Sequence, residues 1–285
     1  MSLRPLTELP PETGRALLGL CLDIDDTLTT DGKLTAEAYQ ALWDAREAGL
    51  LVVPVTGRPA GWADHFARMW PVDGVVAENG ALYLRHHGGH MIRRTVRGDR
   101  AAEAAQRERL LALAADVLRQ VPGTALASDQ AYREFDVAVD FCEDVAPLPR
   151  EAVDRIVRLF EAGGAIAKIS SIHVNAWFGT YDKLGMVKRL LREQHGHDLD
   201  DPAVAARFLY VGDSPNDQPM FAFFPCSVGV ANVRAFADRM DALPTFVTEG
   251  RSGAGFAELV ARIRATRGRT GAPPRPRPAA RTDRR

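Results

Sequence analysis

The stretch ALLGLCLDID, residues Ala16 to Asp25, is apolar along most of its length and turns acidic only at its end. Such a run is typical of a strand buried in a parallel sheet, with its carboxyl end opening on a site. A second buried run, RFLYVGD from Arg207 to Asp213, also ends in an aspartate. Ligands of parallel α/β sheets bind beyond the carboxyl ends of the strands, so the loops after these runs are candidate site loops.

Helical patterns alternate with apolar runs on both sides of these two strands. After the first run we expect a helix with Thr35 as N-cap that ends at Gly49, a strand at 50–56, a helix after Pro59 and a strand at 74–79. Around the second run we expect helices at 183–195 and near Met220, strands CSVGV and TFVT, and further helices to about residue 265. The alternation predicts an α/β fold with a Rossmann-like parallel sheet, built from residues 1–84 and 181–265.

The middle of the chain, residues 85–180, has a different rhythm. We expect a long helix at about 99–120, a helix opened by Pro149, and strands at GAIAKIS and IHVNAWF. The alternating segment YREFDVAVDFC, residues 132–142, predicts a half-exposed antiparallel strand. Helices over an antiparallel sheet form an α+β domain, here inserted into the parallel one as a cap.

Composition places the chain among soluble globular proteins. The 285 residues are 46% hydrophobic and 26% charged, with a net charge of −1, which excludes collagen, a disordered chain and a disulfide-stapled miniprotein. Three widely spaced cysteines form no zinc pattern and fit a reducing cytoplasm. No stretch is apolar enough for a membrane span or a signal peptide, so we expect a cytoplasmic protein without membrane contact.

The tail at 266–285 differs from the rest of the chain. It holds seven arginines against one aspartate and is rich in proline, so residues 1–265 carry a net charge of −7. An acidic body argues against nucleic-acid binding. We expect the Arg/Pro-rich tail to be a disordered, solvated appendage, and the sequence identifies no partner for it.

The chemistry-bearing side chains follow the predicted strands. Four carboxylates would meet one lysine if the loops converge: Asp23, Asp25, Asp213 and Asp217 against Lys183. Such an excess of negative charge requires a cation, and oxygen ligands without histidine or cysteine select Mg²⁺. Because bound Mg²⁺ accepts phosphate oxygens, the set predicts a small phosphorylated substrate.

Each of these residues has an expected role. Asp23 would attack phosphorus to form an aspartyl-phosphate, while Asp25 would protonate the leaving oxygen and later deprotonate the attacking water. Thr56 and Lys183 would donate to the phosphoryl oxygens, and Asn216 to the substrate phosphate. Asp213 would bind the metal, and Asp217 would either bind it directly or orient its shell and Lys183.

Further residues are candidates for substrate binding. The loop Thr56-Gly57-Arg58 follows the second strand, and Arg58 could pair either with substrate or with a local carboxylate. Asn79 lies in a Glu-Asn-Gly turn signal at a strand end that faces the site. His173, Asn175 and Trp177 alternate along one strand, so they share a face that either covers the active site or packs the cap sheet.

Taken together, DIDDT, TGR, a lone downstream lysine and GDSPND resemble the four motifs of the haloacid dehalogenase (HAD) superfamily. The insert between the second and third motifs resembles the C2B-type cap of subfamily IIB, the Cof-type hydrolases. The resemblance implies that Asp23 is the nucleophile, Asp25 the acid/base, and that Mg²⁺ is bound by Asp23, the Asp25 carbonyl and Asp213. Asp26 stands where many family members have glycine.

The expected function is a Mg²⁺-dependent phosphatase for a small phosphomonoester. The resemblance of Glu78-Asn79-Gly80-Ala81 to sugar-phosphatase relatives implies a sugar phosphate, with enzymes acting on mannosyl-3-phosphoglycerate or sucrose phosphate as the nearest kind. Three alternatives stay open at this point. They are a phosphomutase of the same superfamily, a metal-dependent nucleotide-sugar glycosyltransferase using the Asp-x-Asp pair, and a non-enzymatic binding module acting through the tail.

Overall fold

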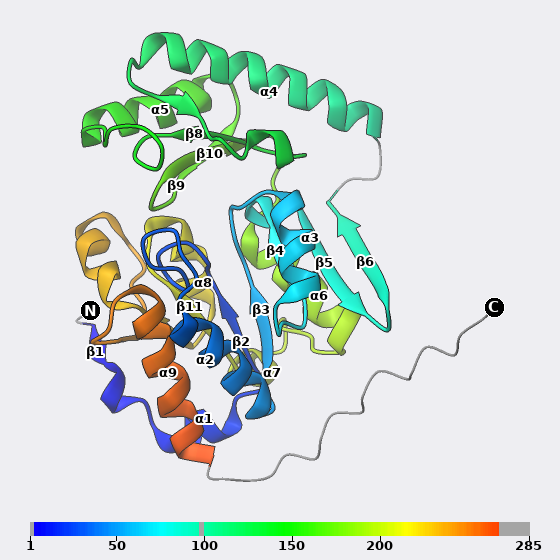
Figure 1. The fold of residues 1–285 in the computed structure, drawn as a ribbon, viewed down its shortest axis with the longest axis vertical. Coiled ribbons are helices and arrows are strands. Elements are labelled where there is room, and N and C mark those ends of the chain that lie inside the picture. The colour runs from blue at the N-terminus through cyan, green and yellow to red at the C-terminus, as the bar shows by residue number, and fades with distance from the viewer. Residues whose placement is uncertain (1–2, 97–99, 268–285) are drawn as a thin grey trace, which may run out of the picture.

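The computed structural model describes residues 3–96 and 100–267, and it divides them into a lower core and an upper cap (Figure 1). The predicted tail falls outside the described residues, apart from its first two. Thr266 and Arg267 belong to the last helix, α9 (Ser252–Arg267), which is therefore slightly longer than expected.

A six-stranded parallel sheet forms the centre of the core. Its strands lie in the order β1 (Arg4–Pro5), β13 (Phe246–Val247), β12 (Cys226–Gly229), β11 (Phe208–Gly212), β2 (Gly19–Leu22) and β3 (Leu51–Pro54). The apolar run at 16–25 contains β2 and the run at 207–213 contains β11. The two strands pair directly, for example Leu22 with Val211. The loops after them therefore leave the same edge of the sheet.

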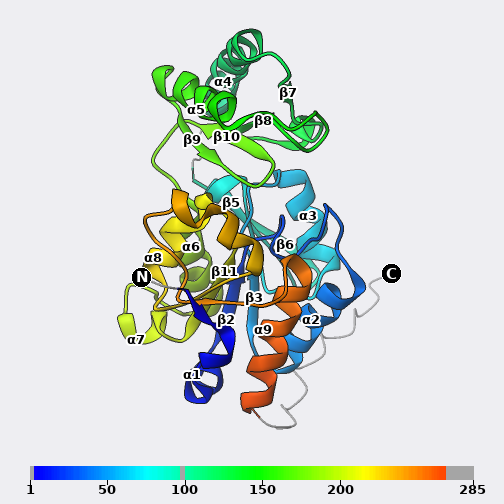
Figure 2. The same cartoon turned by 90° about the vertical axis from the view of Figure 1, so that its left-hand side faces the viewer.

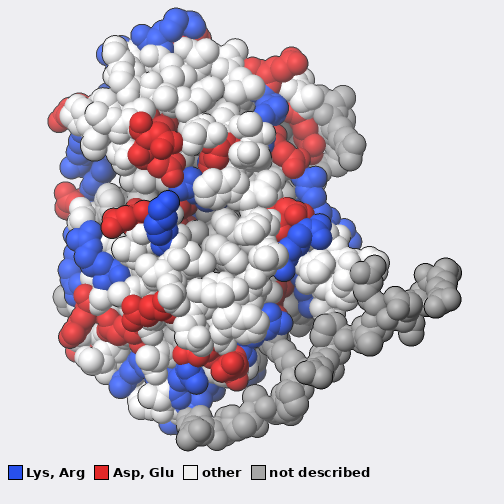
Figure 3. Space-filling model, viewed as in Figure 1, with Lys and Arg blue, Asp and Glu red and all other residues white. Residues whose placement is uncertain are grey.

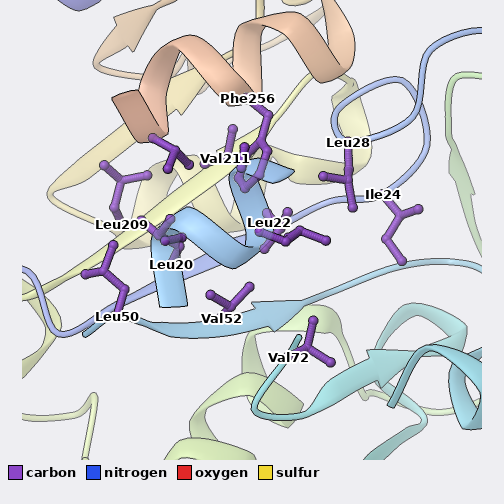
Figure 4. Packing of buried hydrophobic residues seen from close by; sticks show 14 of the residues in the cluster. Leu20, Leu22, Ile24, Leu28, Leu50, Val52, Val72, Leu209, Val211 and Phe256 are labelled. Carbon is purple, nitrogen blue, oxygen red and sulfur yellow. The ribbon is translucent and has the colours of Figure 1, made fainter. Parts of the chain in front are cut away.

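Helices cover both faces of this sheet because its central strands are apolar on both sides. One face packs against α1 (Pro11–Ala16), α2 (Ala36–Glu47) and α9, where Leu20, Leu22 and Val211 meet Phe256 (Figure 4). The other packs against α6 (Lys183–His195), α8 (Gln218–Phe223) and their neighbours, while α7 (Pro202–Ala205) lies between α6 and β11 in the chain. As predicted, Thr35 caps α2, and its side chain accepts the Ala38 N–H.

The segment after α3 (Ala60–Met69) differs from the expectation. Strand β4 (Val75–Ala77) does not extend the parallel sheet as a full strand; it lies beside β3, and an isolated parallel bridge joins Val76 to Val55, the residue after β3. Instead it pairs with β5 (Leu82–His87), which forms an antiparallel hairpin with β6 (His90–Thr95). Since Leu82, Tyr83 and Leu84 are buried in the core clusters, the hairpin packs with the core, although the insert was expected to begin at residue 85.

The cap is a four-stranded antiparallel sheet with helices on its outer face (Figure 2). The strands lie in the order β7 (Ala125–Leu126), β8 (Val137–Asp140), β10 (His173–Trp177) and β9 (Ile166–Ile169), and the helices are α4 (Arg100–Gln120) and α5 (Arg150–Ala162). Strand β8 was expected to be half-exposed and is instead fully buried. The reason is that Val137 and Val139 face the helices while the opposite face of the sheet lies over the core.

Short 3₁₀ helices complete the described chain. They span Leu6–Glu8, Glu78–Gly80, Gln130–Tyr132, Pro215–Asp217 and Ala231–Arg239. The last of these replaces the α-helix expected after the CSVGV strand. Within the described residues, no helix combines the length and the apolar character needed to cross a membrane.

Candidate active site

The sequence-predicted nucleophile and lysine meet at the edge of the core sheet. Asp23 follows β2 and is held by its backbone N–H, which donates to the Val211 carbonyl at 2.9 Å. Lys183 is the first residue of α6, and its Nζ lies 2.7 Å from Asp23 Oδ1. Gly80 allows the residue before Lys183 to lie close to the core: its φ is +104°, and a Cβ at this position would collide with the Asp182 carbonyl.

Asp217 fixes the positions of Lys183 and the Asp213 loop through hydrogen bonds. Its Oδ1 accepts from Lys183 Nζ at 2.9 Å and from the Tyr210 hydroxyl at 2.5 Å. Its Oδ2 accepts the backbone N–H of Asp213 at 3.1 Å. Both oxygens are thus engaged, which suits an orienting role for Asp217 better than direct metal binding.

Asp213 has a different environment. It is fully buried, and its side chain accepts from the Thr27 hydroxyl at 2.9 Å and from the Asn232 amide at 3.2 Å. Neither donor is charged, so burial, reinforced by Asp217 and Asp23, raises the pKa of Asp213 well above its ordinary value. Thr27 closes the DIDDT motif but was given no role from the sequence. Asn232 was not identified at all, because an asparagine outside a motif carries no signal of its own.

We call Asp23, Asp213, Asp217 and Lys183 the acidic cluster. One carboxylate oxygen from each of the three aspartates lies within 4.8 Å of the others. Burial raises the pKa of Asp23 to about 8, although Lys183 opposes this effect. Three buried carboxylates against one ammonium group favour an additional cation, and oxygen-only donors fit a hard divalent ion such as Mg²⁺.

Asp25 lies on the side of the cluster that faces the cap. Its carboxylate accepts from Arg58 Nε at 2.9 Å and 3.0 Å and pairs with Arg58 Nη2 at 2.8 Å. Of the two alternatives for Arg58, the structure has the pairing with local carboxylates. The same guanidinium reaches Asp129 and Glu143 of the cap at 3.2 Å and 2.6 Å.

The other core residues predicted for substrate lie close by. Thr56 is fully buried, and its hydroxyl accepts the Arg58 N–H at 2.9 Å. Gly57 lies close to the amides of Asn79 and Asn175, and the Asn216 side chain accepts from the Ser214 hydroxyl at 2.9 Å.

A small cavity separates these groups from the cap. Its volume is about 10 Å³, room for about one water, so the cap is docked. Core residues Asp23, Asp25, Gly57, Arg58 and Asn216 line it together with cap residues that include His173 and Asn175. His173 and Asn175 thus face the core site, while the Trp177 ring stacks on Tyr181 and its indole N–H donates to the Tyr181 carbonyl.

Asn79 contacts the cap and does not line the cavity. Its amide donates to Asp136 Oδ2 at 3.0 Å, and Asn175 donates to the same oxygen at 3.4 Å. His173 Nε2 lies 2.8 Å from Glu143 Oε2. Contacts from His173 and Arg58 outweigh burial and lower the pKa of Glu143 to about 2.

Sequence reasoning missed the residue that fastens the cap most extensively. Glu78 is fully buried in the core, and its carboxylate accepts backbone N–H groups from Glu134, Phe135 and Asp136 of the cap at 2.6–3.1 Å. It also accepts the Ala60 N–H at 2.9 Å. Burial, together with Asp136, raises the pKa of Glu78 to about 7 despite these donors. The Glu-Asn-Gly turn signal pointed to this loop but not to its role.

Arg133 was also missed. It is 2% exposed, pairs with Asp129 and Asp136 at 2.9 Å each, and donates to the Gly57 carbonyl at 2.8 Å. Its position in the YREFD segment, beside a predicted strand, was only a weak sign of burial. A buried arginine requires charged or polar partners, and the sequence does not show where those partners lie. We call the interface groups Arg58, Glu78, Asp129, Arg133, Asp136 and Glu143 the docking network.

The backbone conformation of Asp26 is one that glycine adopts easily, which accounts for the glycine that many family members have at this position. Its φ is +56°, in the left-handed region where aspartate is tolerated. The Asn232 amide donates to its carbonyl at 2.8 Å and fixes the turn.

Comparison with known proteins identifies the family of the chain. The family described as haloacid dehalogenase-like hydrolase matches residues 20–106. A phosphoglycolate phosphatase from Pyrobaculum neutrophilum is 32% identical over 248 residues, which cover 85% of this chain and 93% of that protein. The chain belongs to the haloacid dehalogenase-like hydrolases. As a hydrolase of this family with a relative named a phosphatase, the chain is itself a phosphatase, and the glycosyltransferase alternative is removed.

Solved structures show that the fold of this HAD-like hydrolase is shared. The C-terminal domain of trehalose-6-phosphate phosphatase from Candida albicans matches with a TM-score of 0.68 at 12% identity, covering 92% of this chain and 98% of that one. Sucrose-phosphatase from Synechocystis matches with a TM-score of 0.56 at 18% identity, covering 87% and 98%. Because the likeness covers most of both chains, it shows that core and antiparallel cap together form a shared fold.

Proposed function

We propose that this phosphatase is Mg²⁺-dependent and hydrolyses a small sugar phosphate through an aspartyl-phosphate on Asp23. The observation that carries the proposal is the position of Asp23: it lines the cavity under the cap and is held by Lys183 at 2.7 Å. A buried carboxylate beside a fixed ammonium group suits attack on a phosphorus whose oxygens the same ammonium can stabilise.

The reaction needs two displacements. An Asp23 oxygen attacks phosphorus as the bond to the leaving alkoxide breaks, and Asp25 gives that alkoxide a proton. Water then attacks the aspartyl-phosphate, Asp25 takes the water's proton, and phosphate leaves as the bond to Asp23 breaks. Lys183, Thr56 and Asn216 would donate to the phosphoryl oxygens.

Mg²⁺ would be held by Asp23, the Asp25 carbonyl and Asp213, where it would offset the negative charge around the phosphoryl group. Asp213 supports this assignment because its buried carboxylate accepts only neutral donors among the described residues. Asp217 would orient Lys183 and the Asp213 loop. Chelator should abolish phosphate release, and added Mg²⁺ should restore it; turnover that survives chelation would contradict the assignment.

The cavity lining favours a hydroxyl-rich leaving group over one with a carboxylate, such as phosphoglycolate. Both arginines that line it are already paired: Arg58 with Asp25 and Glu143, Arg133 with Asp129 and Asp136. Apart from Ile172, the remaining cap side chains are hydroxyl, amide and imidazole groups, which fit sugar hydroxyls. A screen of sugar phosphates against phosphoglycolate tests this point, and preference for phosphoglycolate would reverse it.

The decisive variant is Asp23→Asn. It should lower phosphate release by about 10³-fold or more, because the nucleophile is lost. Asp31→Asn, which changes an exposed aspartate in the same loop, is the matched control and should leave the rate unchanged. A phosphorylated Asp23 peptide, trapped after rapid quenching, would support the intermediate, and full activity of the Asp23→Asn variant would refute it. Release of phosphate in step with substrate loss separates this reaction from that of a phosphomutase.

A further inference from the structure

A second cavity lies on the flank of the joint between core and cap, outside the active site. Its volume is about 800 Å³, and arginines make up half of the described residues that line it: Arg93, Arg94, Thr95, Val96, Glu103, Ala104, Arg107, Arg133, Glu134 and Arg189. Two glutamates accompany the five arginines, so positive charge exceeds negative charge within the described part of the lining. In Figure 3, blue side chains lie along the flank where Figure 1 draws β6.

Existing ion pairs leave part of this charge available. Arg93 pairs with Glu134 at 2.6 Å, and Arg189 pairs with Glu193 at 2.7 Å. Arg94, by contrast, approaches Glu193 only to 4.0 Å, and its side chain is 51% exposed. Its Nη1 donates to the Arg93 carbonyl at 3.0 Å, an exposed hydrogen bond. The guanidinium can therefore turn toward a ligand without breaking a close ion pair.

Arg107 provides a second, independent indication. It projects from α4 of the cap into the cavity lining, and its Nε is buried without a hydrogen-bond partner among the described residues. A buried donor without an acceptor is unfavourable, and more so on a charged group. An anion in the cavity would supply the acceptor.

The arginines come from both domains. Arg93, Arg94 and Arg189 belong to β6 and α6 of the core, whereas Arg107 belongs to the cap. The excess is local, since residues 1–265 together carry −7. Guanidinium groups match phosphate oxygens in pairs, which makes clustered arginines suited to phosphate groups.

We propose that this cavity binds a small polyanion bearing phosphate groups, held between Arg94 of the core and Arg107 of the cap. Arg133 lines this cavity and the catalytic one, and donates to the Gly57 carbonyl. A bound polyanion would therefore tie β6 and α6 to α4 and favour the docked position of the cap. The site is separate from the one that hydrolyses substrate.

Calorimetric titration of the full chain with tripolyphosphate in excess chelator tests the proposal. Without a divalent ion, the aspartates of the active site repel anions, so binding there is suppressed. Wild type and Asp23→Asn should each bind one equivalent. The double variant R94Q/R107Q should bind about tenfold or more weakly. The charge-matched control R155Q/R158Q changes two exposed arginines on α5 and should bind as wild type does.

Two outcomes would overturn the proposal. One is absence of tripolyphosphate binding to wild type under these conditions, with circular dichroism showing a folded chain. The other is binding that is unchanged in R94Q/R107Q but lost in Arg58→Gln, which would place the anion in the catalytic cavity. An equal loss in R94Q/R107Q and R155Q/R158Q would show general charge attraction and would also refute a built site.

Discussion

The acidic cluster and the docking network are both sets of buried charges beyond the strand ends, yet they are satisfied in different ways. In the docking network, every carboxylate accepts from a guanidinium or from several backbone N–H groups. In the acidic cluster, Asp213 accepts only from neutral Thr27 and Asn232 among the described residues. Buried charges that are all paired are typical of an interface between domains. Buried carboxylates that outnumber the cations beside them indicate a place where a ligand binds.

The loops divide between these two tasks. Those after β2 and β11 supply Asp23, Asp213 and Asp217 to the acidic cluster. Those after β3 and β4 supply Arg58 and Glu78 to the docking network. Asp25 connects the two sets, because Arg58 pairs with it and with Glu143 of the cap at the same time. Docking of the cap therefore determines the position of the proposed acid/base.

Removing the lysine of the acidic cluster should have the largest effect. Lys183→Gln leaves Asp23 and Asp217 buried without their cation, so we expect the free energy of unfolding in chelator to fall by about 3–5 kcal/mol. Urea unfolding measures the change. Lys188→Gln is the control: Lys188 pairs with the exposed Asp200, and its loss should cost less than about 1 kcal/mol. Equal losses in the two variants would contradict the distinction.

In the docking network, Glu78→Ala should come next. The substitution removes the acceptor of four backbone N–H groups, and we expect a loss of about 2–3 kcal/mol in the free energy of unfolding. Hydrogen exchange of the amides at 134–136 should accelerate with it. Glu134→Ala removes an exposed side chain from the cap segment 134–136 itself and should leave those amides protected. Unchanged exchange in the Glu78→Ala variant would mean that Glu78 does not hold the cap.

The same residue predicts a pH dependence. The pKa of Glu78 is about 7 in the folded chain, above the ordinary 4.5, under the influence of burial and of Asp136, which itself pairs with Arg133. A raised carboxyl pKa means that the folded state binds more protons, so stability should fall as pH rises from about 4.5 to 7. Glu78→Gln should remove on the order of 2 kcal/mol of this decline. The difference between wild-type and variant unfolding curves across that window measures it, and parallel curves would refute the assignment.

The acidic cluster was far easier to predict from sequence than the docking network. Asp23, Asp213 and Lys183 follow apolar strands or open a helix, and parallel topology brings such ends together whatever the details of packing. The antiparallel cap was predicted from another local signal, the alternation of apolar and polar residues in YREFDVAVDFC between helical segments. Glu78 and Arg133 follow no such rule: their partners are backbone groups and carboxylates supplied by another domain. Burial of β8 likewise depends on where the cap docks, which its alternating pattern does not encode.

The smallest expected effect is the coupling energy of an exposed ion pair, compared with that of a buried pair at the same distance. Arg58–Glu143 and Arg93–Glu134 both join core to cap at 2.6 Å, but the side chains are 5% and 25% exposed in the first pair and 39% and 50% in the second. Water screens the exposed pair, so a double-mutant cycle with Arg93→Gln and Glu134→Gln should give a coupling energy below about 1 kcal/mol. The buried pair should couple by about 2–3 kcal/mol, because each partner leaves the other desolvated when removed. Both cycles are measured by urea unfolding. If the exposed pair coupled as strongly as the buried one, the distance between the charged atoms would set the coupling energy. The expected difference between exposed and buried pairs at the interface of core and cap would then be refuted.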